Sequence, residues 1–245
     1  MARMVNDETA AIVAEHPDRF AGLAFLPLQD ADASVRELER GMRELGLIGA
    51  AVSTHVDGED WDSERLFPVL QAANDLGALV FVHPASVRAR GILPNYHLVN
   101  MIGNPLETTI AIGSIVFGGV LDRLDSLRLV FAHGGGYAAF AAGRFDHGAT
   151  VRPESKGTLL PPADYLRRLY FDDLTHSALA LRYLVDLVGI DQVVLGSDFP
   201  ADMGYVDPVG WLETAPLLDA AEKAQILGGN LERLLGLGRA EMASA

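Results

Sequence analysis

The chain has 245 residues, 49% of them hydrophobic, which is enough apolar material to bury a sizeable core. Its formal net charge is −14, from 19 Lys and Arg against 33 Asp and Glu, and this argues against nucleic acid or an anionic membrane as the main partner. The absence of Cys excludes disulfides, thiolate metal sites and a Cys nucleophile. The N-terminus has no signal-like apolar segment, and no apolar run is long enough to span a bilayer, so we expect a cytosolic protein.

Strands and helices are predicted to alternate along the chain. Short apolar runs bounded by turn residues predict six strands, at 20–26, 48–53, 79–83, 127–133, 169–172 and 192–195. Apolar residues at helical spacing predict helices at 33–45, 63–76, 105–123, 136–147, 178–188, 208–218, 219–227 and 230–235. The helix at 105–123 has the clearest start signal, because Asn104 can cap it and Glu107 completes a capping box. This alternation predicts a parallel sheet covered by helices.

Three apolar runs, at 79–83, 127–133 and 193–198, each end on a side chain that can bind a metal or transfer a proton, namely His83, His133 and Asp198. Turn residues follow each of them. Because the carboxyl ends of parallel strands meet at one rim, where barrel enzymes keep their chemistry, we expect a shared site. An open, doubly wound sheet would instead be served by a Gly-rich phosphate loop, and neither G-x-G-x-x-G nor G-x-x-x-x-G-K-[ST] occurs. The sequence therefore favours a TIM-type (β/α)₈ barrel.

The segment HGGG at 133–136 has two interpretations. It is typical of the oxyanion hole of a lipase-like hydrolase, but that chemistry requires a G-x-S-x-G nucleophile segment, which the sequence lacks. We therefore interpret His133 as an acid or base, with the glycines allowing a substrate to approach the backbone. Arg144 lies on the helix that follows and is expected to reach the same rim, where its guanidinium would suit a carboxylate.

Eight segments together carry a resemblance to a known family. They are GLAFLPLQD (22–30), STHVDG (53–58), FVHP (81–84), MIGNPLETTIA (101–111), FGGVLDR (117–123), FAHGGG (131–136), GRFDHG (143–148) and LGSDFP (195–200). In this order they resemble the amidohydrolase-related decarboxylases of the aminocarboxymuconate-semialdehyde decarboxylase type, from about Asn6 to Leu237. The resemblance implies a metal-dependent barrel, with Zn²⁺ or another divalent metal, that removes a carboxylate from an unsaturated or aromatic acid.

The resemblance also assigns roles to individual residues. His83 and Asp198 match the metal ligands of the family, and Asp198 is counted among the catalytic residues as well. His133 matches the acid/base that stands beside a metal-bound water. Arg144 matches the residue that holds the substrate carboxylate. The resemblance further implies a homodimer.

The residues that would select the substrate differ from those of the tryptophan-pathway decarboxylase. That enzyme has tryptophans where this chain has His97 and Asn100, and exchanging large rings for polar groups should change which acid fits. His55, His147 and His176 lie near strand ends or on the Arg144 helix. Each is a candidate either for the cavity lining or for a supporting or surface position.

The sequence departs from the family at its N-terminal side. The family's first strand carries an H-x-H pair that supplies two further metal ligands, and no H-x-H occurs here. His16 lies in a predicted loop, and we expect it to be a surface residue and not a replacement ligand. Six predicted strands also fall short of the eight of a complete barrel. We therefore expect residues 1–245 to form a single amidohydrolase-related barrel domain, incomplete at its N-terminus and shortened from a longer protein.

The function expected from these observations is that of a metal-dependent carboxy-lyase acting on a small carboxylic acid, with no nucleic acid or membrane partner. Two alternatives stay open. One is a hydrolase of the same superfamily that attacks a lactone or an amide. The other is an inactive barrel fragment that lacks half of the metal site.

Overall fold

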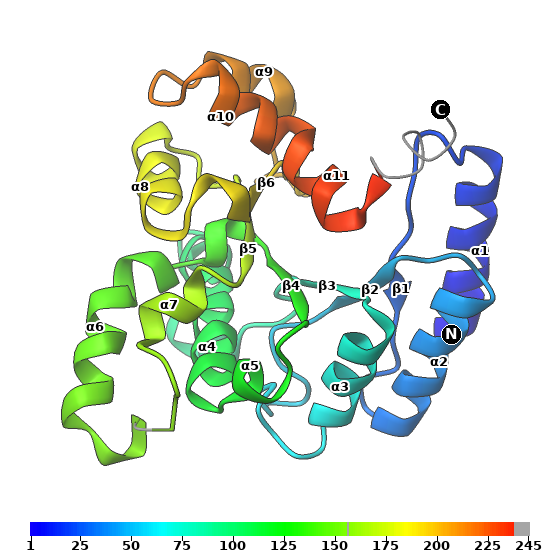
Figure 1. Cartoon of the computed structure of the whole chain (residues 1–245), viewed down its shortest axis with the longest axis horizontal. Coiled ribbons are helices and arrows are strands. Elements are labelled where there is room, and N and C mark those ends of the chain that lie inside the picture. Colours follow the sequence, from blue (N-terminus) through cyan, green and yellow to red (C-terminus); the bar gives the residue numbers. More distant parts are fainter. Residues whose placement is uncertain (156, 238–245) are drawn as a thin grey trace.

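The computed structural model describes residues 1–155 and 157–237. Its centre is one sheet of six parallel strands, whose order in the sheet is their order in the chain (Figure 1). The strands are β1 (Ala24–Phe25), β2 (Gly49–Val52), β3 (Leu79–Val82), β4 (Arg128–Phe131), β5 (Tyr170–Asp172) and β6 (Val193–Val194). A doubly wound sheet would reverse its strand order, whereas sequential order is that of a barrel. In the described residues this barrel is open between β1 and β6.

Helices surround the strands (Figure 1). They are α1 (Ala2–Glu15), α2 (Ala31–Arg43), α3 (Phe67–Leu76), α4 (Asn104–Phe117), α5 (Val120–Arg123), α6 (Ala138–Val151), α7 (Pro162–Leu166), α8 (Ala178–Val188), α9 (Pro208–Thr214), α10 (Ala220–Ala224) and α11 (Asn230–Leu235). Within the described ranges, no helix combines the length and apolar character needed to cross a membrane.

Side chains of the strands alternate between two apolar clusters, because successive residues of a strand point to opposite faces. On the helix-covered face, Val80 and Val82 belong to the main core with Ile112 of α4. On the other face, Leu79 and Val130 join a smaller cluster with Val194 and with Leu234 of α11. Both faces of the sheet therefore carry buried apolar side chains, and this explains why the predicted strands appear as continuous apolar runs.

All six predicted strands are present, but the capping box predicted for the long helix at 105–123 is wrong. The chain enters α4 through a π-helical turn at Val99–Gly103, so Asn104 is already helical and caps nothing. The Glu107 carboxylate instead accepts hydrogen bonds from the backbone and side chain of Arg88 (2.6 and 2.8 Å). The same predicted helix is divided in two at Gly119, where φ is +66°.

The outer edge of β1 is held by a single buried side chain of α1. Asn6 is fully buried, accepts a hydrogen bond from the Phe25 N–H (2.7 Å) and donates to the Phe25 carbonyl (3.0 Å). Its amide also donates to Glu37 of α2 (2.7 Å), which pairs with Arg40. Asn6 thus occupies both backbone groups of Phe25, as a neighbouring strand would.

Two consecutive carboxyl groups are buried at the end of β5. Asp172 Oδ1 accepts the Gly134 and Leu174 N–H groups (2.8 and 3.1 Å), and burial raises the pKa of this carboxyl. Asp173 Oδ1 accepts the Gly196 N–H (2.8 Å), while its Oδ2 has no hydrogen-bond partner among the described residues. Burial raises the pKa of Asp173 to about 7. These carboxyls tie the end of β5 to the turns that follow β4 and β6.

We predict that Asn6→Ala destabilises the chain by about 2 to 3 kcal/mol, because Phe25 and Glu37 would lose hydrogen-bond partners in a buried place. Urea unfolding of both proteins measures the difference. Glu8→Ala, an exposed change on the same helix, is the control and should stay within about 0.5 kcal/mol. Equal effects of the two substitutions would contradict this role of Asn6.

We predict that Asp173→Asn removes part of the pH dependence of stability. The folded pKa of about 7 lies above the ordinary value of 3.8, so the folded state holds this proton more tightly. The stability from this proton is complete at low pH and is lost as pH rises from about 4 to about 7, at about 1.4 kcal/mol per pH unit. Urea unfolding of wild type and variant across this window measures the slope. An unchanged slope in Asp173→Asn would contradict the prediction, and the exposed control Asp18→Asn should keep it.

Candidate active site

Three side chains from the ends of three strands meet at one point of the rim. His83 follows β3, His133 follows β4 and Asp198 lies on the turn after β6. One potential ligand atom from each side chain lies within 4.8 Å of the other two. His83 Nε2 lies 3.1 Å from Asp198 Oδ1, and His133 Nε2 lies 3.7 Å from Asp198 Oδ2. The two imidazole rings meet edge to face, 5.0 Å between centroids. The structure therefore brings these three predicted residues into a single group.

The backbone at this group is strained. His133 and Asp198 have φ values of +59° and +54°, a region that costs a residue with a side chain on the order of 1 to 3 kcal/mol. The turn after His133 needs its glycines, because a Cβ at Gly136 would lie 2.1 Å from the carbonyl oxygen of Pro105 at the start of α4. This close packing fixes the position of His133 against α4.

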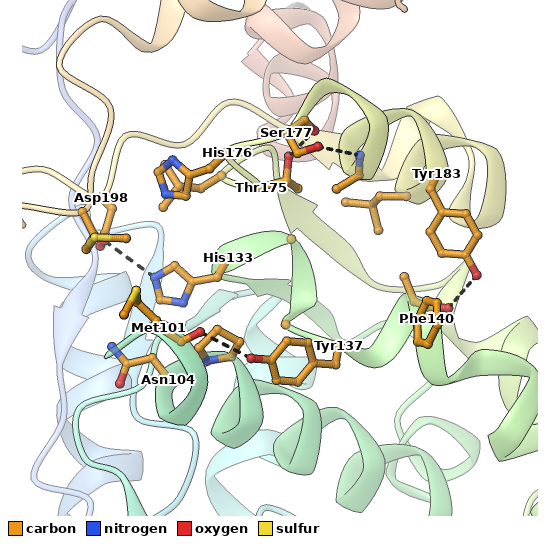
Figure 2. Close-up of a pocket in the computed structure, with 18 of the residues that line it drawn as sticks. Met101, Asn104, His133, Tyr137, Phe140, Thr175, His176, Ser177, Tyr183 and Asp198 are labelled. Carbon is orange, nitrogen blue, oxygen red and sulfur yellow. Dashed lines mark hydrogen bonds and ion pairs between the residues drawn. The ribbon is translucent and has the colours of Figure 1, made fainter. Parts of the chain in front are cut away.

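A cavity of about 700 Å³ opens beside His133 and Asp198 (Figure 2). Most of its wall is apolar, from Met101, Pro105, Phe140, Leu174, Leu179, Leu184 and Met203. Polar groups come from Asn100, Asn104, Tyr137, Thr175, His176 and Ser177. Figure 2 shows His133, His176 and Asp198 at one end of the cavity and Phe140 and Tyr183 at the other. None of the described lining residues is Lys or Arg.

A second cavity, of about 630 Å³, lies on the inner face of the sheet. His83 and Asp198 line it, together with apolar side chains that include Leu79, Val130 and Val194. Asp198 therefore separates the two cavities and borders both of them.

The His133 imidazole lies in a largely desolvated place. Burial lowers its pKa, and the neighbouring His83 acts in the same direction, while Asp172 and Asp198 oppose the shift. Its Nδ1 is buried and has no hydrogen-bond partner in the described part of the chain. His133 is therefore held as a neutral imidazole over a wider pH range than a free histidine.

The group has the chemistry of a divalent metal site. Two imidazole nitrogens and a carboxylate oxygen are ordinary ligands of Zn²⁺ and related metals. Their mutual distances are short enough for one ion to contact all three, and His83 Nε2 and His133 Nε2 both face the same carboxylate. His133, predicted as the acid/base, thus lies within ligand distance together with the two predicted ligands.

Two residues predicted to bind the substrate do not lie at the cavity of the single chain. Arg144 is exposed on α6 and lines neither cavity, because its side chain is on the solvent side of that helix. His97 is exposed, with φ of +60°, in the segment before α4, and it also lines neither cavity. Asn100, three residues later, does line the larger one.

The remaining candidate histidines divide as follows. His176 lines the large cavity. His55 is buried in a supporting position, with Nε2 3.2 Å from Ser86 Oγ and 3.9 Å from Glu107. His147 on α6 and His16 after α1 are exposed and line neither cavity.

Four residues at the site were not predicted from the sequence: the buried pair Asp172 and Asp173, and Tyr137 and Thr175 in the cavity wall. A signal for the aspartates was present, because Asp172 ends the predicted strand 169–172, as His83 ends its own strand, and Asp173 follows directly. Tyr137 and Thr175 had no comparable signal, since each comes to the cavity through a turn whose direction depends on tertiary packing.

The chain is similar in sequence to known decarboxylases. The chain is 39% identical over 239 residues to 2-amino-3-carboxymuconate-6-semialdehyde decarboxylase of Dictyostelium discoideum, covering 97% of this chain and 67% of that protein. It is 27% identical over 262 residues to gamma-resorcylate decarboxylase of Polaromonas sp. strain JS666, covering 97% of this chain and 77% of the relative.

Solved structures agree with these relatives. The 5-carboxyvanillate decarboxylase of Sphingomonas paucimobilis superposes with a TM-score of 0.88 at 29% identity, covering 96% of this chain and 72% of that one. A dihydroxybenzoic acid decarboxylase of Polaromonas sp. JS666, with bound manganese and the inhibitor 2-nitroresorcinol, also gives 0.88, at 25% identity, covering 98% and 76%. The family model for amidohydrolases matches residues 1–237. The chain belongs to the amidohydrolase family.

Proposed function

We propose that this chain is a metal-dependent carboxy-lyase that removes CO₂ from an unsaturated or aromatic carboxylic acid. The observation that carries the proposal is the group of His83, His133 and Asp198, of which His133 and Asp198 line one end of a largely apolar cavity of about 700 Å³. A cavity of this size and character accommodates a ring-sized organic acid. The relatives and structural neighbours described above are named as decarboxylases of such acids, which supports the same reaction here.

We propose His83 and Asp198 as the metal ligands, with His133 completing the donor set or acting next to it. A divalent metal held there would supply a Lewis acid against the negative charge of the reacting acid. Both Zn²⁺ and Mn²⁺ suit imidazole and carboxylate donors, and one structural neighbour contains manganese. We propose Zn²⁺ as the resident metal, with Mn²⁺ as the alternative to be tested.

Decarboxylation requires a proton at the carbon that carries the carboxylate. We propose that His133 delivers this proton through Nε2, after which the bond to the carboxylate breaks, its electron pair returns to the ring or double bond, and CO₂ leaves. Because burial lowers the pKa of His133, its protonated form is a stronger acid than a free imidazolium. The neighbouring Asp198 carboxylate, 3.7 Å away, stabilises the protonated ring before transfer.

The apolar wall would hold the body of the acid and exclude water from the reacting carbon. Asn100 lines this wall and is our proposed substrate contact from the sequence. Substrate binding by Arg144 and His97 stays a prediction, because neither side chain lines the cavity of the single chain. Assembly as a homodimer and a cytosolic location are proposals of the same kind, supported by the family resemblance alone.

We predict that His83→Ala and Asp198→Ala lose bound metal, whereas His133→Gln keeps it and lowers kcat at least about a hundredfold. Elemental analysis gives the metal content, and release of ¹³CO₂ from carboxyl-labelled aromatic acids gives turnover. His16→Ala, an exposed histidine outside both cavities, serves as the control. Full turnover in His133→Gln would contradict the proton-donor role, and loss of metal there would make His133 a ligand. Hydrolysis of a lactone or amide without ¹³CO₂ release would favour the hydrolase alternative.

From the role that the family resemblance assigns to Arg144, we predict that Arg144→Gln raises KM for the acid at least about tenfold, with a smaller effect on kcat. This result requires the guanidinium to reach a substrate outside the cavities of its own chain, because Arg144 lines neither of them. Steady-state kinetics of the two proteins measures this. Arg36→Gln, a change of the same kind on α2 outside both site cavities, is the matched control. An unchanged KM in Arg144→Gln would remove Arg144 from the substrate site.

A further inference from the structure

His176 is the one histidine of the large cavity that the proposed chemistry leaves without a role. It follows β5 by four residues and lies immediately before Ser177, whose side chain caps α8. Figure 2 shows its ring at the same end of the cavity as His133 and Asp198. His176 is an exposed residue, and its ring nitrogens have no hydrogen-bond partner within residues 1–155 and 157–237, so they are open to solvent and to a ligand.

The position of His176 is fixed by two aromatic side chains from the segment after β6. The His176 backbone N–H donates to the Tyr205 hydroxyl (2.8 Å), and the two rings meet edge to face at 4.9 Å. Tyr205 in turn stacks on Trp211 of α9, with 4.6 Å between centroids and 20° between planes. These contacts support a left-handed backbone at His176, where φ is +54°. Strained backbone that is held in place by neighbouring side chains is concentrated at binding and active sites. The conformation of His176 therefore indicates a role in binding at the cavity.

The charges around the cavity indicate what His176 could bind. The described lining contains no Lys or Arg, and Asp198 adds negative charge at the same end. An acid with a second oxygen substituent would therefore need a donor other than the group around Asp198. Among the described residues of this end, the His176 ring offers such a donor, besides the side-chain amide of Asn104.

We infer that His176 is a specificity-determining residue whose ring N–H binds a second oxygen substituent of the substrate, and that Tyr205 and Trp211 are its positioning residues. This inference rests on the proposed function for the identity of the cavity as a substrate site. What it adds is the residue that makes this contact, with a second carboxylate or a ring hydroxyl as the acceptor.

The test compares two probes, benzoate and benzene-1,3-dicarboxylate, by calorimetric titration of the full chain in the presence of Mn²⁺. His176→Gly removes the ring but tolerates the left-handed backbone, and His176→Asn restores a polar group at a position Asn also tolerates. Tyr205→Phe removes only the hydroxyl that accepts the His176 N–H. His16→Asn, on an exposed histidine, is the matched control.

We expect wild type to prefer the dicarboxylate, and His176→Gly to lose about tenfold in affinity for it with less than a twofold change for benzoate. His176→Asn should recover part of the loss, Tyr205→Phe should weaken the dicarboxylate selectively, and His16→Asn should change neither affinity. Metal content should be unchanged throughout.

Three results would overturn the inference. The first is that wild type binds both probes equally or binds neither. The second is that His176→Gly loses affinity equally for both probes. The third is that His176→Gly keeps the preference of wild type for the dicarboxylate. Failure of the proposed function can be distinguished from failure of this inference. In that case the chain would release no ¹³CO₂ but would still prefer the dicarboxylate in the binding test.

Discussion

The register of parallel strands is the constraint on which the rest of the structure depends. Val82 of β3 pairs with Phe131 of β4, which pairs in turn with Phe171 of β5, so the ends of these strands stand at one height. Residues that follow them must therefore emerge at a common rim, where His83 and His133 meet. A shift of one residue in any strand would turn these side chains to the opposite face and disperse the group.

The rim is built at a cost in local stability. His133 and Asp198 adopt left-handed backbone conformations, and two carboxyls are buried directly beneath them at the end of β5. Asp172 holds the turn after β4 through the Gly134 N–H, while Asp173 holds the turn after β6 through the Gly196 N–H. The apolar clusters on both faces of the sheet offset this cost. Strain and buried charge therefore concentrate where the proposed chemistry takes place.

The strands and the three rim residues could be predicted from sequence because both follow from local patterns, namely an apolar run and the residue that ends it. The directions of side chains outside the strands could not. Arg144 has suitable spacing, but the rotation of α6, which is set by packing, turns it to solvent. The capping box at Asn104 failed because Glu107 has a stronger partner in Arg88, distant in sequence. Asp173 was overlooked although the same strand-end rule applied to it.

The central claim is that His83 and Asp198 hold a divalent metal beside His133, at the cavity where we propose that decarboxylation takes place. Anomalous X-ray diffraction from crystals of the chain grown with Mn²⁺ tests it most directly, because it locates the ion independently of turnover. The account predicts one strong anomalous peak within bonding distance of His83 Nε2 and an Asp198 carboxylate oxygen, bordering the large cavity. A peak elsewhere, or none at saturating Mn²⁺, would contradict it.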